Sequence, residues 1–279
     1  MPLQTSGQIT LINIKNELGG TVPHDLGEYR GTEGIGGTLP TGEIAMSDFY
    51  GQGLHSFSHL GSIDDTTDMI MSGTVNGGSL TSNDVLIVLG THEAYSGTAA
   101  YTANGVALNA RLTVTPVQSN IQYGGLFIGT KNVSGVLVGD TTLTIAQTTN
   151  PGSGQSFRAG AAMFRLENGS GAFAIRETTS NTVNGGSQQG GSVSITPTVS
   201  SNEHVFICGH ASQGDNTTST LSASNGTLTR YEGVSEPQGS GEFAVLTGAT
   251  NPTITLTSTE TSSSSQGLAV ACMVIGYPA

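Results

Sequence analysis

The chain has 279 residues with a formal net charge of −12, and it contains 41 glycines and only 10% charged residues. This balance argues against nucleic acid and anionic membrane surfaces as partners, because both bind clustered Lys and Arg. The longest apolar runs, Val85–Leu89 and Leu268–Ile275, are far shorter than the roughly 20 residues that span a bilayer, so no membrane insertion is expected. Met1–Thr10 lacks a basic region followed by an apolar stretch, which predicts no signal peptide.

Residues 1–52 differ from the rest of the chain. Four apolar residues recur there with helical spacing, and a Gly-Gly pair follows them: Leu11, Ile12, Ile14 and Leu18. The segment Ser6–Leu11 is echoed by Thr41–Met46, and each copy leads into a short element. We expect a short helix in a small N-terminal segment that needs a partner surface or other copies of the chain to be well ordered.

From Gly53 onward, apolar residues alternate with Thr and Ser in short runs bounded by Gly, Asn, Asp and Pro, which is the pattern of β-strands. Many short strands at close spacing predict an all-β, antiparallel, jelly-roll-like β-sandwich. The predicted strands are Leu54–Leu60, Met69–Val75, Asp84–Gly90, Arg111–Val117, Gln122–Gly129, Thr142–Ala146, Ala161–Leu166, Phe173–Thr178, Val193–Val199, His204–His210, Thr227–Glu232, Glu242–Thr247, Thr253–Ser258 and Leu268–Tyr277.

The β region also contains signs of an internal duplication. Ser82–Gly90 aligns without gaps to Ser201–Gly209, and Thr142–Ile145 has a counterpart in Thr253–Leu256. The hexapeptide Thr-Val-Asn-Gly-Gly-Ser occurs twice, at Thr74–Ser79 and Thr182–Ser187, but an Asn-Gly turn has a local cause and this match can arise by chance. The halves would be about 53–178 and 179–279, either two parts of one sandwich or two tandem sandwiches.

No motif in the sequence selects a catalytic or metal site. The carboxylate cluster at Asp64, Asp65 and Asp68 lacks EF-hand spacing and is interpreted as a solvated turn, although a cation there stays open. His204, Phe206, Cys208 and His210 share one face of a predicted strand and are interpreted as packing rather than zinc ligands.

The remaining candidates are equally unspecific. His55 and His59 are expected on a polar edge strand or at an inter-chain contact, and Cys208 and Cys272 are expected to be free, buried thiols. There is no nucleophile elbow, and the spacing of Glu167, Glu177, Glu232, Glu236 and Glu242 selects no pair for glycoside hydrolysis. We therefore expect no enzyme activity and no cofactor.

Loops between the strands are the expected place for binding, since strands supply a rigid platform. Tyr95 and Tyr101 are assigned to a Gly- and Thr-rich loop and are the predicted ligand-binding residues, with packing on the sandwich rim as the alternative. The predicted long loops are Thr91–Asn109, Gln147–Gln155, Ser180–Gly191, Gln213–Asn225 and Gly233–Gly241. Their polar side chains that suit sugar hydroxyls are Asn150, Gln188, Gln189, Asp215 and Asn216.

The N-terminal motifs carry a family resemblance. Ser6-Gly7-Gln8-Ile9-Thr10-Leu11 followed by Asn16-Glu17-Leu18-Gly19, and Gly42-Glu43-Ile44-Ala45-Met46-Ser47-Asp48-Phe49-Tyr50-Gly51, resemble a segment at the start of many tailed-bacteriophage structural proteins. Asn13 departs from that pattern, which keeps Ser or Asp there. The resemblance implies a virion component, assembled in the host cytoplasm, whose residues 1–52 attach it to other virion proteins. The attachment residues it implies are Ile9, Leu11, Ile14, Leu18, Ile44, Met46, Phe49 and Tyr50.

These observations predict a non-enzymatic tail-fibre or appendage protein that is anchored by its N-terminus and displays a β-sandwich toward the host surface. The alternatives are a capsid decoration or cement protein and, from another class, a polysaccharide depolymerase. A homo-oligomer is expected, with a trimer favoured, because closed symmetry turns weak contacts into avidity. A host-surface glycan is the expected ligand.

Overall fold

The structure is a computed structural model, and it describes residues 10, 14, 33–34, 37–38, 57–65, 70–75, 80–82, 84–94, 99–114, 123–133, 137, 141–147, 158–167, 174–183, 191–201, 203–212, 218–231, 235–236, 239–259 and 267–276. These residues are almost entirely β-strands, and every strand pairing is antiparallel. This confirms the predicted all-β, antiparallel sandwich. Within this part of the chain there is no helix with the length and hydropathy that crossing a membrane requires.

The first unit of the fold is a sandwich of two sheets. Its five-stranded sheet, inner sheet 1, has the order β3-β11-β5-β9-β8, and its four-stranded sheet, outer sheet 1, has the order β4-β10-β6-β7. The strands are β3 (Phe57–Asp65), β4 (Ile70–Val75), β5 (Val85–Ala94), β6 (Ala99–Ala103), β7 (Val106–Ala107), β8 (Asn109–Val114), β9 (Tyr123–Asn132), β10 (Thr141–Gln147) and β11 (Arg158–Leu166).

The second unit repeats this arrangement. Inner sheet 2 has the order β12-β20-β14-β18-β16, with β17 on β18, and outer sheet 2 has the order β13-β19-β15. The strands are β12 (Ala174–Val183), β13 (Gly191–Ile195), β14 (His204–Ser212), β15 (Thr218–Ala223), β16 (Thr227–Tyr231), β17 (Ser235–Glu236), β18 (Gly239–Thr247), β19 (Ile254–Thr259) and β20 (Gly267–Gly276). A short pair, β1 (Glu33–Gly34) and β2 (Gly37–Thr38), lies outside both units.

In each unit the chain alternates between two sheets in the order of a jelly roll. Strands β3, β5, β9 and β11 of inner sheet 1 occupy the same places as β12, β14, β18 and β20 of inner sheet 2, and β4, β6 and β10 correspond to β13, β15 and β19. The chain is therefore two jelly rolls in tandem. The second begins with β12 at Ala174, earlier than residue 179, where the sequence placed the boundary.

One pair of glycines shows why the aligned segments are alike. Gly90 of β5 and Gly209 of β14 are equivalent, and each leaves room for a large side chain from the outer sheet of its own jelly roll. A Cβ on Gly90 would lie 2.3 Å from Tyr101 Cε1, and one on Gly209 would lie 2.8 Å from Leu256 Cδ1. The repeated hexapeptide is different, because its copies begin at the ends of β4 and β12, which are not equivalent strands.

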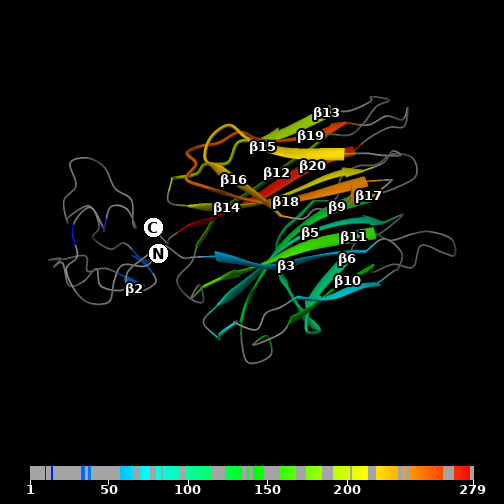
Figure 1. Cartoon of the computed structure of the whole chain (residues 1–279), viewed down its shortest axis with the longest axis horizontal. Helices are drawn as coiled ribbons and strands as arrows, with labels where there is room; N and C mark the ends of the chain where they lie inside the picture. Colours follow the sequence, from blue (N-terminus) through cyan, green and yellow to red (C-terminus); the bar gives the residue numbers. More distant parts are fainter. Residues whose placement is uncertain are drawn as a thin grey trace.

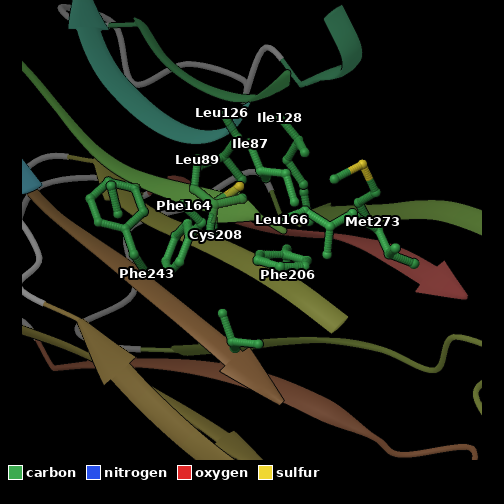
Figure 2. Close-up of a cluster of buried hydrophobic side chains, with 14 of the residues drawn as sticks. Ile87, Leu89, Leu126, Ile128, Phe164, Leu166, Phe206, Cys208, Phe243 and Met273 are labelled. Carbon is green, nitrogen blue, oxygen red and sulfur yellow. The ribbon is translucent and has the colours of Figure 1, made fainter. Parts of the chain in front are cut away.

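The two jelly rolls stack face to face through their inner sheets, so that four layers follow one another (Figure 1). Strand β14 contacts both β5 and β9 of the other jelly roll. The interface between the jelly rolls is a continuous apolar cluster: Ile87, Leu89, Leu126, Ile128 and Phe164 of inner sheet 1 face Phe206, Phe243 and Met273 of inner sheet 2 (Figure 2). A separate core fills the space between the inner and outer sheet of each jelly roll.

Three local predictions need correction. Strand β5 continues to Ala94, four residues past its predicted end at Gly90, and β6 occupies 99–103 inside the predicted loop 91–109. Strand β3 runs from Phe57 to Asp65 rather than from Leu54 to Leu60, so Asp64 and Asp65 belong to a strand and not to a turn. In these two places strand pairing with β11 and β10 continues beyond the clearest apolar alternation. The third correction concerns two predicted loops: 213–225 contains β15, which pairs with β19, and 233–241 contains β17 and the start of β18.

Candidate functional site

Strand direction divides the stack into two ends. At the proximal end, Phe57 begins β3 and is paired with Leu166, which is paired with Val85. At the distal end, Ala159 is paired with both Asp65 and His92. The same ends coincide in the two jelly rolls, because Phe57 contacts His204 at the proximal end and Thr91 contacts His210 toward the distal end. The chain thus enters β3 from residues 1–52 at the proximal end.

Connections of similar length join strand ends at both ends of the stack, and those at the proximal end include residues 76–84, 133–140, 167–173 and 196–203. Eight connections join strand ends at the distal end. They cover residues 66–69, 95–98, 115–122 and 148–157 in the first jelly roll and 184–190, 213–217, 232–238 and 260–266 in the second, where β17 interrupts the third. These eight segments contain no Lys and no Arg and are rich in Gly, Ser, Thr, Asn and Gln. Six predicted ligand-binding or sugar-compatible residues fall within them: Tyr95, Asn150, Gln188, Gln189, Asp215 and Asn216. Their own placement lies outside the described residues.

Tyr101 does not belong to this set, which corrects its assignment as a ligand-binding loop residue. It lies in β6, is only 4% exposed, and stacks on Phe127 with ring centroids 4.0 Å apart. Its hydroxyl is hydrogen-bonded to Nδ1 of His92 at 3.0 Å. A ring that is held on its face and at its hydroxyl inside the first jelly roll is not available to an external ligand, so the packing alternative describes Tyr101.

A buried polar contact joins the two jelly rolls below the distal end. Thr91 Oγ1 of β5 and His210 Nδ1 of β14 lie 2.7 Å apart and form a hydrogen bond. Thr91 and His210 are equivalent residues of the two repeats, and equivalent residues touch each other where they lie close to the axis that relates the repeats. The inner sheets face each other with β5 and β14 running in the same direction, which is the arrangement that a two-fold rotation produces. The jelly rolls are therefore related by a pseudo-two-fold axis that passes close to this pair and runs along β5 and β14.

Glycines make room for this contact from both sides. A Cβ on Gly124 of β9 would lie 2.2 Å from His210 Nε2, and a Cβ on Gly241 of β18 would lie 2.4 Å from Thr91 Cγ2. On the opposite face of β5, His92 is accommodated by Gly125, where a Cβ would lie 2.3 Å from the imidazole Cε1. Burial lowers the pKa of His92 to about 4 and that of His210 to about 3, the latter with a further contribution from His92. Both rings are neutral at physiological pH.

A second pair of equivalent residues closes the proximal end. Asp84 and Glu203 each precede the central strand of their jelly roll and accept a hydrogen bond from a backbone N–H three residues earlier, at 2.6 Å from Thr81 and 2.7 Å from Ser200. Asp84 also pairs with Arg165 at 3.1 Å, and Glu203 pairs with Arg176 at 3.5 Å. These carboxylates hold the turns that start β5 and β14, which is a structural role.

The other predicted residues are placed as follows. Phe206 and Cys208 pack in the interface between the jelly rolls, as the alternation on their strand predicted, and both cysteines are buried and free. His59 lies at an exposed edge against Phe164 and Tyr231. Among the described residues there is no group of three His, Cys, Asp or Glu side chains that could hold a metal ion.

Little of the predicted attachment segment falls within the described residues. Ile14 is fully buried, and its N–H donates to the carbonyl of Thr10 at 3.1 Å, the spacing of an α-helical turn. The other predicted attachment residues lie outside the described part of the chain: Ile9, Leu11, Leu18, Ile44, Met46, Phe49 and Tyr50. His55 and Asp68 lie outside it as well.

Sequence reasoning missed the contact between Thr91 and His210, although a signal was present. The gapless alignment of Ser82–Gly90 with Ser201–Gly209 extends by one residue to place Thr91 opposite His210. In a two-fold arrangement of repeats, aligned polar residues within apolar strands are candidates for mutual contact.

Comparisons of the chain with protein-family models, with curated proteins and with solved structures gave no match.

Proposed function

We propose that the protein is a non-enzymatic structural component of a tailed-bacteriophage virion, of the tail-fibre or appendage type. In this proposal residues 1–52 attach the chain to other virion proteins. The tandem jelly rolls form a rigid body that follows this attachment segment, and their distal end faces the host surface.

The observation that carries the proposal is the separation of the two ends. Strands of both jelly rolls run between a proximal end, which the chain enters from residues 1–52, and a distal end where eight connections join the strands. Binding residues of proteins concentrate in loops on a rigid scaffold. With the anchor at the proximal end, the connections at the opposite end are the ones that a displayed recognition module would present to a ligand.

The composition of the distal connections favours a neutral, hydroxylated ligand. They carry amide and hydroxyl side chains and a tyrosine but no cationic side chain, which suits a host-surface glycan better than an acidic polymer. The N-terminal resemblance supplies the virion context. A homo-oligomer, with a trimer favoured, would present several distal ends together and raise the avidity of weak contacts.

Adsorption of phage particles to host cells tests the proposal. Particles would carry Tyr95→Ala, the pair Gln188→Ala and Gln189→Ala, or the pair Asp215→Ala and Asn216→Ala, all in distal connections. Ser82→Ala and Ser201→Ala are matched controls, because both residues are exposed in proximal turns. We expect slower adsorption for at least one distal variant and normal adsorption for the controls. Normal adsorption of all three distal variants would refute the assignment of the distal end.

The location on the particle and the absence of activity have separate tests. Electron microscopy of particles with the labelled protein is expected to show label on the tail, and label on the capsid surface alone would favour a decoration or cement protein instead. Release of reducing sugar from host envelope glycans that is lost on changing one carboxylate pair would favour a depolymerase. Light scattering of the purified protein is expected to give a mass above that of the monomer.

A further inference from the structure

Strand β12 is the longest edge strand that the structure describes. It has 10 residues and pairs with β20 along one edge, and no strand in the described part of the chain pairs with its other edge. The next longest, β3, is interrupted by a shift in register against β11, whereas β12 stays in register with β20 from Glu177 to Val183. This outer side of residues 177–183, the open edge, is thus long and regular.

The open edge lies at the surface of the second jelly roll. The exposed side chains along it are those of Thr178, Ser180, Asn181 and Val183. Natural sheets protect such edges with lysine, proline or a bulge, because an uncovered edge pairs readily with another strand. Residues 177–183 contain neither lysine nor proline, and their register with β20 contains no bulge. The open edge therefore lacks the usual protection.

The backbone of β12 presents alternate residues to the open edge. The N–H of Thr182 donates to Oδ1 of its neighbour Asn181 at 2.9 Å, whereas the N–H of Thr179 is directed toward the facing residue of β20. Consecutive N–H groups of a strand point to opposite sides within the sheet. The N–H and C=O groups of Thr178, Ser180 and Thr182 therefore point away from β20.

Charge does not oppose a contact between two copies of this strand. The chain has a net charge of −12, but β12 contains one cationic and one anionic residue, Arg176 and Glu177. Arg176 lies 3.5 Å from Glu203. Glu177 accepts a hydrogen bond from the N–H of Thr198 at 2.9 Å. Both charges are thus held within the chain, and the other side chains of the open edge are neutral.

We propose that the open edge is a site of self-association, where β12 pairs antiparallel with β12 of a second copy of the chain. A two-fold axis through Ser180 places Thr178 opposite Thr182 of the second copy, and residues paired in this way exchange both of their N–H···O bonds. Threonine pairs across strands are favourable, and the two copies of inner sheet 2 become one continuous sheet. An identical strand fits better than an unrelated one, because the same three residues satisfy both open edges and the contact closes on itself.

This two-fold contact is separate from the proposed function. It joins copies in pairs, whereas the trimer favoured above requires a different, three-fold contact. The open edge also contains none of the distal residues whose variants test adsorption. Self-association through β12 and adsorption to the host can therefore fail independently of each other.

Cross-linking of the full chain tests the contact directly. Ser180→Cys is treated with copper phenanthroline, which oxidises two thiols to a disulfide, and the products are separated on a denaturing gel without reductant. Thr257→Cys is the matched control, because Thr257 is exposed on β19, whose two edges are already paired with β13 and β15. The native cysteines are buried, and the unaltered chain measures their background. We expect a covalent dimer from Ser180→Cys and only background from Thr257→Cys.

Light scattering supplies a second measurement at matched protein concentration. Ser180→Lys brings two like charges together at the axis, and the exposed position allows the chain itself to fold. Its mass should be half that of the unaltered chain, and Thr257→Lys should keep the full mass. The proposal is overturned if Ser180→Cys forms no more dimer than Thr257→Cys, or if Ser180→Lys has the mass of the unaltered chain.

Discussion

The equivalent glycines Gly90 and Gly209 give the sharpest test of how the two jelly rolls are packed. Changing each to alanine makes the same chemical change at the same place in the two repeats, and only the neighbours differ. At Gly90 the new methyl group meets the Tyr101 ring, with Cε1 at 2.3 Å, Cζ at 2.8 Å and the hydroxyl at 2.9 Å. At Gly209 it meets Leu256 Cδ1 at 2.8 Å and Leu221 Cδ2 at 3.5 Å, which are the ends of flexible side chains.

The Tyr101 ring cannot move aside cheaply, because it is stacked on Phe127 and its hydroxyl is hydrogen-bonded to His92. Overpacking a core costs about 1–3 kcal/mol, and a lost hydrogen bond adds about 1 kcal/mol. We therefore expect Gly90→Ala to lower the free energy of unfolding by about 3 kcal/mol and Gly209→Ala by about 1 kcal/mol, the low end of that range. The entropic effect of replacing glycine, about 0.4–1 kcal/mol, is common to both variants and cancels in the comparison.

Urea unfolding of the two variants and the unaltered chain measures both values. The second jelly roll has a leucine, Leu221, at the position equivalent to Tyr101. A double-mutant cycle with Tyr101→Leu therefore isolates the contact between the methyl group added at residue 90 and the Tyr101 ring. In that background the cost of Gly90→Ala should fall to the cost of Gly209→Ala, a coupling of about 2 kcal/mol. Equal costs for the two single variants, or no coupling to Tyr101, would refute this account of the first jelly roll.

Three further predictions concern buried polar groups. Burial lowers the pKa of His92 and His210 below 6.5, so the stability that these neutral rings contribute is complete above pH 6.5 and declines as the pH falls. The free energy of unfolding, measured by denaturation, should be about 4 kcal/mol lower at pH 5 than at pH 8, about 2 kcal/mol for each ring. Equal free energies of unfolding at the two pH values would contradict neutral, buried rings. Asp84→Asn should lower the stability by about 3 kcal/mol, because it leaves Arg165 without its buried partner. Glu203→Gln should lower it by only about 1 kcal/mol, because Arg176 is 42% exposed. Thermal unfolding that ranks the two variants in the opposite order would contradict this reasoning. Tyr101→Phe removes the hydroxyl bonded to His92 and should cost about 1–2 kcal/mol while host adsorption of particles stays normal; reduced adsorption of folded particles would return Tyr101 to the list of ligand-binding residues.

The amino-acid sequence by itself determined the class of the fold and the existence of the repeat. Alternation of apolar residues with Thr and Ser is a local property of each strand, so it predicted the β-strands and the common face of Phe206 and Cys208. The alignment of Ser82–Gly90 with Ser201–Gly209 fell on the central strands of the two jelly rolls, where close packing of both faces restricts the choice of residues.

Tertiary structure alone decided which faces meet and where the strands end. Alternation gives a strand two faces but does not say which sheet covers each face. The sequence therefore did not predict that His210 contacts Thr91 between the jelly rolls, whereas His92 contacts Tyr101 inside the first jelly roll. The Gly- and Thr-rich segment after Gly90 resembled a loop, yet pairing with β9, β10 and β11 turned it into strands and buried Tyr101. Local composition does not record such long-range pairing, because its stabilisation comes from neighbours distant in the chain.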